Sequence, residues 1–209
     1  EAAHLYLEKL DRPADAADAL LLAASRAPDD LGLLVELARC LSRAGREAEA
    51  RERVGAAIAR GTGTRADRVS LLRLRAELSS EPDQLGDAIF DLEAAYALDA
   101  TVAPDLAEYL ERRKATPAGS GDRALWLRLF DLWLTMARYD GARDLLGEWL
   151  SQEPGDIGFL RKAAFMDALA GRWDQVVELC DRIVGLEEGQ ARVGAALLVA
   201  AACSQAGYP

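Results

Sequence analysis

Few side chains in this sequence have the types and spacing that catalysis requires. His4 is the only histidine, and the three cysteines, Cys40, Cys180 and Cys203, are far apart within apolar stretches. Nucleophilic catalysis requires such a group beside a base, and a structural zinc site requires several of these ligands at close spacing. We therefore expect buried thiols, no metal or cofactor, and no catalytic role for His4.

Two further features contain residue types that are found in binding or catalytic sites, but their positions in the sequence do not fit such a site. Residues 61–64, Gly-Thr-Gly-Thr, resemble a phosphate-binding turn, but they follow a predicted helix and lack the lysine that contacts phosphate. Six carboxylates fall on the polar sides of predicted helices, where we expect them to be solvated: Asp87, Asp91, Glu93, Asp140, Asp144 and Glu148. The sequence predicts that the protein is not an enzyme.

The net charge of −10, from 25 basic and 35 acidic residues, opposes binding to nucleic acid, because such binding depends on neutralised phosphates. The longest apolar stretch, residues 195–203, is too short for a membrane helix, so we expect no membrane insertion. Unpaired cysteines favour the cytoplasm. Because the sequence begins at Glu1 without Met, a leader can already have been removed, and the periplasm stays the alternative.

The apolar residues must lie on helices that recur along the chain. Three alanines recur at an interval of 38 residues: Ala38, Ala50 and Ala57 reappear as Ala76, Ala88 and Ala95. Helical spacing predicts one helix from Leu31 to a stop at Gly45 and a second from Glu47 to Arg60. A partial earlier copy precedes this pair, and further copies follow. A recurring helix pair of this size indicates an array whose stacked units create the core.

These units resemble the tetratricopeptide repeat family. Residues 123–156 match its signature best, at Trp126, Leu129, Trp133, Tyr139, Ala142, Leu146 and Pro154. Residues 31–64 match without the closing proline, and residues 69–102 match as a degenerate copy with Arg75 and Ser79 at usually apolar positions. The resemblance implies an all-α, right-handed superhelical solenoid of antiparallel helix pairs. Sel1-like or HEAT repeats are the alternative, and we expect a bacterial source.

The repeat pattern is interrupted once. We expect a first block at 1–103, with a partial repeat and two repeats, and a second block at 123–209, with two repeats and a truncated final helix. Between them, residues 104–122 are predicted to be a solitary helix followed by a segment of linker composition at 115–121. This joint is interpreted either as a hinge or as a loop packed on the array.

In the resembled family, first helices line a concave groove that binds partners. The resemblance implies a partner-binding groove formed by Val35, Arg39, Arg43, Arg73, Glu77, Leu127, Asp131, Arg161, Lys162 and Phe165. The asparagine that the family uses to clamp a terminal carboxylate is absent, so chaperone-tail recognition is not expected. An exposed Phe165 would be a candidate anchor. The alternative is that these arginines are only solvated or paired with neighbouring carboxylates.

The predicted function is a protein-interaction or scaffold module that binds a peptide or a partner protein. Rigid stacked helix pairs hold such a surface open before binding, which lowers the cost of ordering it. The alternative is a regulatory or substrate-docking region of a larger multidomain enzyme. Self-association through uncapped ends is a third possibility, because terminal repeats of such arrays normally carry polar caps.

Overall fold

The computed structural model describes residues 12–188, apart from 62 and 80, together with residues 193, 194, 196, 200, 201, 203–205 and 207. Its helices are α2 (Pro13–Arg26), α3 (Leu31–Arg43), α4 (Glu47–Arg60), α5 (Arg65–Glu77), α6 (Leu85–Leu98), α7 (Ala103–Lys114), α8 (Pro117–Ser120), α9 (Arg123–Thr135), α10 (Tyr139–Gln152), α11 (Ile157–Leu169) and α12 (Trp173–Leu186), with a 3₁₀ helix, η1 (Ala100–Val102). The described residues contain no strand. His4 and part of the predicted final helix, residues 193–204, lie outside the described residues.

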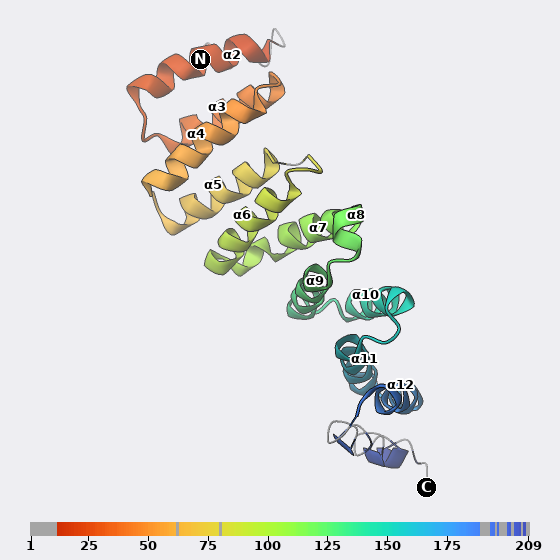
Figure 1. Ribbon diagram of the computed structural model, residues 1–209. Coiled ribbons are helices and arrows are strands. Elements are labelled where there is room, and N and C mark those ends of the chain that lie inside the picture. The colour runs from red at the N-terminus through yellow and green to blue at the C-terminus, as the bar shows by residue number, and fades with distance from the viewer. Residues whose placement is uncertain are drawn as a thin grey trace. The chain divides into compact units, whose positions relative to one another are not determined.

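Contacts divide the chain into two compact units with a boundary between Gly121 and Asp122. Consecutive helices pack together from α2 to α8 in the first unit and from α9 to α12 in the second (Figure 1). Within a unit, each first helix is followed after a turn by a second helix that packs against it. The predicted all-α array of helix hairpins is confirmed.

Side-chain caps fix where each first helix begins. Asp30, Thr64, Asp122 and Asp156 immediately precede α3, α5, α9 and α11, and each side chain accepts a hydrogen bond from a backbone N–H of the first turn. Caps of this type are favoured because the first backbone N–H groups of a helix have no partner within it. The caps are 34 residues apart in each unit, from 30 to 64 and from 122 to 156. Each first helix then has 13 residues.

The predicted interval of 38 residues holds for the second helices only. The turn from first to second helix occupies residues 44–46 in α3/α4 but residues 78–84 in α5/α6, which adds four residues. Ala88 and Ala95 therefore match Ala50 and Ala57, as predicted. The match of Ala38 with Ala76 is wrong, because Leu72 has the position of Ala38 in the capped helix. The predicted start of this unit at 69 is thus one helical turn late.

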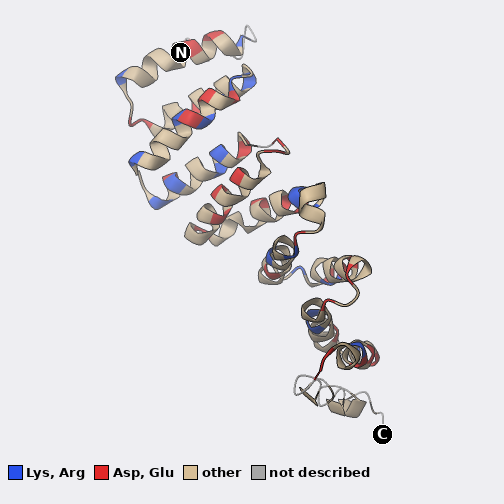
Figure 2. Cartoon of the chain, viewed as in Figure 1, with Lys and Arg blue, Asp and Glu red and all other residues tan. Residues whose placement is uncertain are grey.

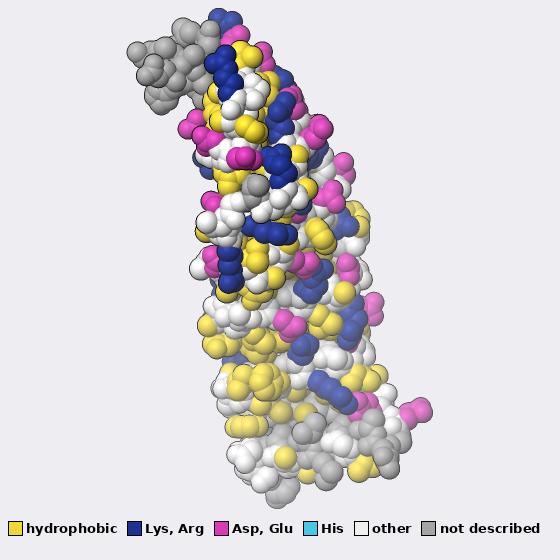
Figure 3. Space-filling view, turned by 90° about the vertical axis from the view of Figure 1, so that its left-hand side faces the viewer, with side chains coloured by type: hydrophobic (Ala, Val, Ile, Leu, Met, Phe, Trp, Pro, Cys, Tyr) yellow, Lys and Arg dark blue, Asp and Glu magenta, His cyan; other side chains and the backbone are white. Residues whose placement is uncertain are grey.

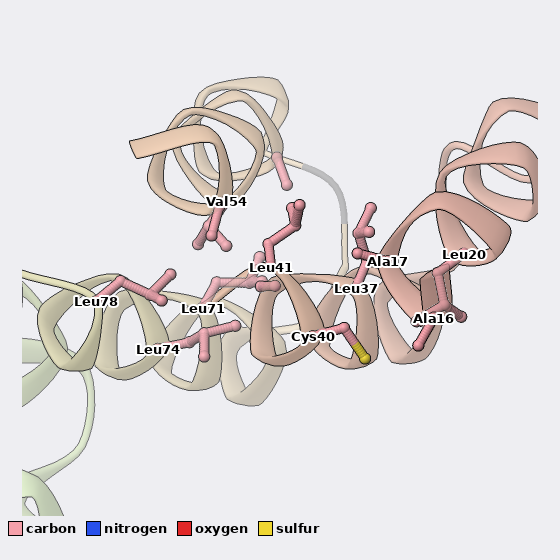
Figure 4. Packing of buried hydrophobic residues seen from close by; sticks show 13 residues of the cluster. Ala16, Ala17, Leu20, Leu37, Cys40, Leu41, Val54, Leu71, Leu74 and Leu78 are labelled. Carbon is pink, nitrogen blue, oxygen red and sulfur yellow. The ribbon is translucent and has the colours of Figure 1, made fainter. Parts of the chain in front are cut away.

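The second helices contribute one buried stripe in every hairpin. Its members are the fourth, eighth and eleventh residues: Ala50, Val54 and Ala57 in α4, Ala88, Leu92 and Ala95 in α6, Ala142, Leu146 and Trp149 in α10, and Val176, Cys180 and Ile183 in α12. Small residues at these positions let neighbouring helices approach closely. In the N-terminal unit the stripe joins a cluster of mostly aliphatic side chains from α2, α3, α4 and α5 (Figure 4).

Aromatic residues fill the corresponding space in the C-terminal unit. The ring centroid of Trp149 lies 5.2 Å from that of Trp126 and 5.0 Å from that of Phe159. The Asp156 carboxylate accepts hydrogen bonds from Nε and Nη2 of Arg123, at 2.6 and 3.0 Å, and from Nε1 of Trp149, at 3.1 Å. The bonds from Arg123 are the main reason that the pKa of Asp156 falls to about 2. One carboxylate therefore connects α9, α10 and α11.

The segment after α7 differs from the prediction. Residues 115–121 were predicted as linker with no further helix, but they contain α8, which packs on α7. Gly119 is buried there, and a Cβ at this position would overlap the backbone oxygen of Arg113. The α7 helix is not solitary, since it packs on α6 and Tyr109 donates a 3.2 Å hydrogen bond to the Ala76 carbonyl. The block boundaries and the joint at 104–122 stay predictions.

Candidate functional site

The fifth, ninth and thirteenth residues of each first helix lie on one side of that helix, which we call the first-helix face. They are Val35, Arg39 and Arg43 in α3, Val69, Arg73 and Glu77 in α5, Leu127, Asp131 and Thr135 in α9, and Arg161, Phe165 and Leu169 in α11. Only Val69 among them is buried. The capped register places Arg73, rather than Glu77, at the position of Arg39.

In the N-terminal unit, this face carries cations in two different states. Arg39 and Arg43 are exposed and form no ion pair with the described residues, while Val35 packs against the core cluster. Arg73 forms a 2.6 Å ion pair with Asp105 of α7. Glu77 is exposed. The two arginines of α3 are therefore available to a partner, whereas Arg73 is already neutralised.

In the C-terminal unit, Arg161 of the first-helix face and Lys162, which follows it, are both paired. Lys162 Nζ lies 3.3 Å from Asp131 Oδ1 and 4.6 Å from the ring centroid of the buried Phe130. Arg161 pairs with the largely buried carboxylate of Glu187. Leu127 is half-buried. Arg161 and Lys162 are therefore both paired with neighbouring carboxylates, which was the alternative interpretation of the basic residues.

The apolar residues of α11 are exposed, as the sequence predicted for Phe165. The exposed fractions are 57% for Phe165 and 64% for Leu169, which follows one helical turn later. Leu169 also borders a shallow recess of about 370 Å³ whose apolar lining includes Tyr139 and Met166. Exposed large apolar side chains that adjoin one another are a feature of interaction surfaces.

One of the carboxylates predicted to be solvated is buried. Asp91 is 2% exposed, and it accepts hydrogen bonds from Nε and Nη2 of Arg75 at 2.7 and 2.5 Å. This pair also raises the pKa of Arg75. A buried charge requires such a partner. The prediction for Asp91 is wrong because Asp91 is turned towards α5, where it pairs with Arg75 at a position that is apolar in other hairpins.

A second buried carboxylate holds two arginines. Asp167 is 5% exposed, and its Oδ1 accepts from Nε of Arg143 and Nε of Arg172, both at 2.9 Å. Asp167 is the eleventh residue of α11, as Arg75 is of α5. The same position thus holds a charged residue in both units, and each is compensated by ion pairing. These groups stabilise the hairpins and have no arrangement suited to catalysis.

Sequence reasoning did not identify Phe90, which is 70% exposed on α6. It is the sixth residue of its second helix, where the other hairpins carry Glu52, Asp144 and Glu178. An aromatic residue at a position that is acidic in the other copies was a usable signal. This difference is seen only when the second helices are aligned from their first residues.

Cys40 and Cys180 are buried, and burial raises the pKa of both thiols, which makes them poor nucleophiles. Cys203 is half-buried and also free. Among the described residues there is no group of three or more His, Cys, Asp or Glu side chains able to hold a metal ion. None of the described helices combines the length and apolar character needed to cross a membrane.

Charged residues are distributed unevenly over the surface. In the N-terminal unit, α5 carries mostly basic residues and α6 only acidic ones (Figure 2). On the face drawn in Figure 3, charged side chains of both signs occur along most of the length, and hydrophobic side chains gather in the lower part.

The fold defines a class, the arrays of stacked helix hairpins, and comparison with solved structures specifies it further. The chain is similar to the TPR2AB domain of yeast Sti1, in a structure of its complex with pHSP90, at a TM-score of 0.50 and 14% identity, with 97% of this chain and 84% of that chain covered.

Two other solved structures are similar over most of their length. A tetratricopeptide repeat protein from Parabacteroides merdae ATCC 43184 aligns at a TM-score of 0.41 and 15% identity, with 98% and 90% covered, and MamA aligns at 0.42 and 16%, with 92% and 98% covered. No family model and no curated protein matches the sequence. The chain has the fold of tetratricopeptide repeat proteins.

Proposed function

We propose that this chain is a protein-interaction module without catalytic activity of its own, and that its first-helix faces bind a segment of a partner protein. The fold supports the class, since the Sti1 domain that it resembles was solved as a complex with pHSP90. The three free cysteines fit a reducing compartment, and we place the protein in the cytoplasm.

The single observation that carries this proposal is the state of Arg39 and Arg43 on α3. Both side chains are exposed and form no ion pair with the described residues, although the opposite side of the helix, with Leu37 and Leu41, is buried. Guanidinium groups bind carboxylates with two parallel hydrogen bonds. The partner of this face is therefore a segment that carries carboxylates.

In the C-terminal unit, Phe165 and Leu169 would supply an apolar anchor to the same or another segment. Exposed aromatic side chains at a binding surface contribute a large share of affinity. Because Arg161 and Lys162 are already paired, we assign them to positioning of the face and not to direct recognition.

The proposal is tested by affinity capture with the whole chain, comparing the proteins retained by wild type with those retained by the Arg39→Glu/Arg43→Glu variant. Arg26→Glu is the matched control, because Arg26 is exposed on α2 and forms no ion pair with the described residues. We expect specific partners to be lost from the double variant alone. Identical retention by all three proteins would contradict a role for this face.

A further inference from the structure

A second surface of the N-terminal unit has the form of a docking recess. It lies between the end of α4, the start of α5 and the end of α6, away from the first-helix face, and has a volume of about 350 Å³. Its floor is apolar and consists of Ala57, Ile58, Leu71 and Leu98. Arg65 and Arg68 line its edge, and no carboxylate belongs to its lining.

The recess exists because a packing position of the repeat holds a charged residue. Arg68 is the fourth residue of α5, where α9 has Trp126 and α11 has Leu160. Both of these equivalents are almost fully buried. Arg68 is exposed, so it does not cover the floor beneath it.

A comparison of Arg68 with Leu160 shows which apolar contacts are absent in the N-terminal unit. Leu160 packs in a cluster with Ile183 and Leu150, the residues that correspond to Ala95 of α6 and Ile58 of α4. In the N-terminal unit the leucine has been replaced by Arg68 and the isoleucine by Ala95. Ala95 is fully buried and does not line the recess, so the part left uncovered between α4, α5 and α6 is the one next to Arg68.

Neither arginine at the edge forms an ion pair with a described carboxylate, although the pKa of Asp99 is lowered mainly by the hydrogen bond from the Thr101 backbone and also by the charge of Arg65. The side chain of Arg68 forms no hydrogen bond or ion pair with the described residues, and the guanidinium of Arg65 donates to the backbone oxygen of Leu98. The nearest acidic side chains are occupied elsewhere. Asp67 accepts from the backbone N and the hydroxyl of Thr64 in a capping box, at 2.7 and 2.8 Å.

The other acidic neighbour, Asp99, accepts a 2.9 Å hydrogen bond from the backbone N of Thr101 as the cap of η1. The two arginines belong to a basic stretch of the sequence, whereas α6, which also borders the recess, carries only acidic charges, at Asp87, Asp91 and Glu93. Between Arg39 and Arg75 the sequence holds ten arginines and only four carboxylates, and basic residues follow α5 along its length (Figure 2).

We propose that this recess binds a bulky apolar side chain of a partner protein segment in which carboxylates flank that side chain. The apolar side chain takes the place that Leu160 fills in the C-terminal unit, and the flanking carboxylates pair with Arg65 and Arg68. The interaction is one of shape and charge together: the floor selects a large apolar group, and the arginines select an acidic context. This site goes beyond the first-helix face of the proposed function and does not depend on it.

The probe is a fluorescein-labelled peptide, Glu-Asp-Phe-Asp-Glu with blocked ends, titrated with the whole chain and followed by fluorescence polarisation. Two control peptides replace Phe by Ala or every acidic residue by Lys. We expect saturable binding of the first peptide, and affinity lower by about tenfold or more for each control, since burial of an aromatic side chain and pairing of charges both contribute.

Protein variants locate the binding site. Arg68→Glu should lower the affinity for the peptide about tenfold. Arg68→Trp should abolish binding, because the new side chain itself occupies the recess. Arg26→Glu, an exposed change on α2 outside both proposed surfaces, should leave this affinity unchanged. Leu98→Ala, which removes part of the floor, should weaken binding by a smaller factor.

Several results would overturn the proposal: no saturable binding, equal binding of the Ala peptide, or full affinity in Arg68→Trp. Loss of affinity in Arg39→Glu/Arg43→Glu alone would assign the peptide to the first-helix face. If light scattering shows a dimer that Arg68→Trp converts to monomer, the occupant is a second copy of this chain and the proposal is also wrong. Stronger binding of a DNA oligonucleotide than of the acidic peptide would likewise contradict it.

Discussion

Helices α10, α11 and α12 repeat the arrangement of α4, α5 and α6. The two sets differ in the side chains that pack between their helices. In the C-terminal set, Leu160 of α11 packs with Leu150 and Ile183 in an apolar cluster. In the N-terminal set, Arg68 takes the position of Leu160, and the floor beneath it stays open. Caps and small residues fix the backbone in both sets. A large apolar side chain can therefore be replaced without a change in the helix arrangement, and a recess is left in its place.

The largest expected effect concerns the aromatic packing of the C-terminal unit. Trp149→Ala removes contacts with Trp126 and Phe159 and a hydrogen bond to Asp156, and should lower the free energy of unfolding by about 3–5 kcal/mol. Tyr139→Ala, on the same helix but 55% exposed, should cost less than about 1 kcal/mol. Urea denaturation measures both, and similar losses in the two variants would show that the unit is not built around this cluster.

A smaller loss of stability is expected when the ion pair between α5 and α6 is broken. Other hairpins have apolar contacts at the same positions. Asp91→Asn leaves the guanidinium of Arg75 without its charge partner and should destabilise the protein by about 2–3 kcal/mol. Replacing both residues in Arg75→Leu/Asp91→Leu should be nearly neutral or stabilising, because Leu41 and Leu145 occupy these positions in other hairpins. If the double variant is less stable than Asp91→Asn in thermal unfolding, the pair is more than a substitute for apolar contacts.

The third prediction uses the pH dependence of the C-terminal unit. The pKa of Asp156 is about 2 in the folded protein and near 3.8 without its partners, so the unfolded chain takes up a proton first as the pH falls. The stabilisation is complete above about pH 4 and is lost between pH 4 and pH 2, by about 1–2 kcal/mol after allowance for solvent screening.

The measurement is the free energy of unfolding in urea at several pH values between 2 and 5. Asp156→Asn should remove this part of the pH dependence. Asp122→Asn is the matched control, because Asp122 is also a cap but accepts only from the backbone N of Ala124 and Leu125. A wild-type curve no steeper than that of Asp156→Asn would mean that the pairing with Arg123 contributes little.

The helices themselves were predictable from the sequence because they depend on local spacing. Apolar residues at helical intervals and stops such as Gly45 identified α3 and α4, and the fourth, eighth and eleventh positions of the second helices gave the recurring stripe. The register of α5 was not predicted, since the matched alanines at 76, 88 and 95 concealed four extra residues in the following turn. Thr64 followed by Asp67, a capping box, was the signal that contained the correct start.

The candidate surfaces were predictable only in part. Exposure of Arg39, Arg43 and Phe165 follows from their places on a first helix. Pairing of Arg73 with Asp105 and of Arg161 with Glu187 depends on side chains from distant elements, which periodicity does not contain. The recess beside Arg68 required the corrected register, because only then does Arg68 fall at the position of Trp126 and Leu160.

The most direct test of this register is the stability of Arg68→Leu, which restores the residue found at the fourth position of α3 and α11. If Arg68 occupies a packing position above an uncovered apolar floor, the free energy of unfolding should increase by about 0.5–1.5 kcal/mol over wild type in urea denaturation. Arg26→Leu, at an exposed position at the end of α2, should give no gain. A stability equal to or below wild type for Arg68→Leu would contradict the account.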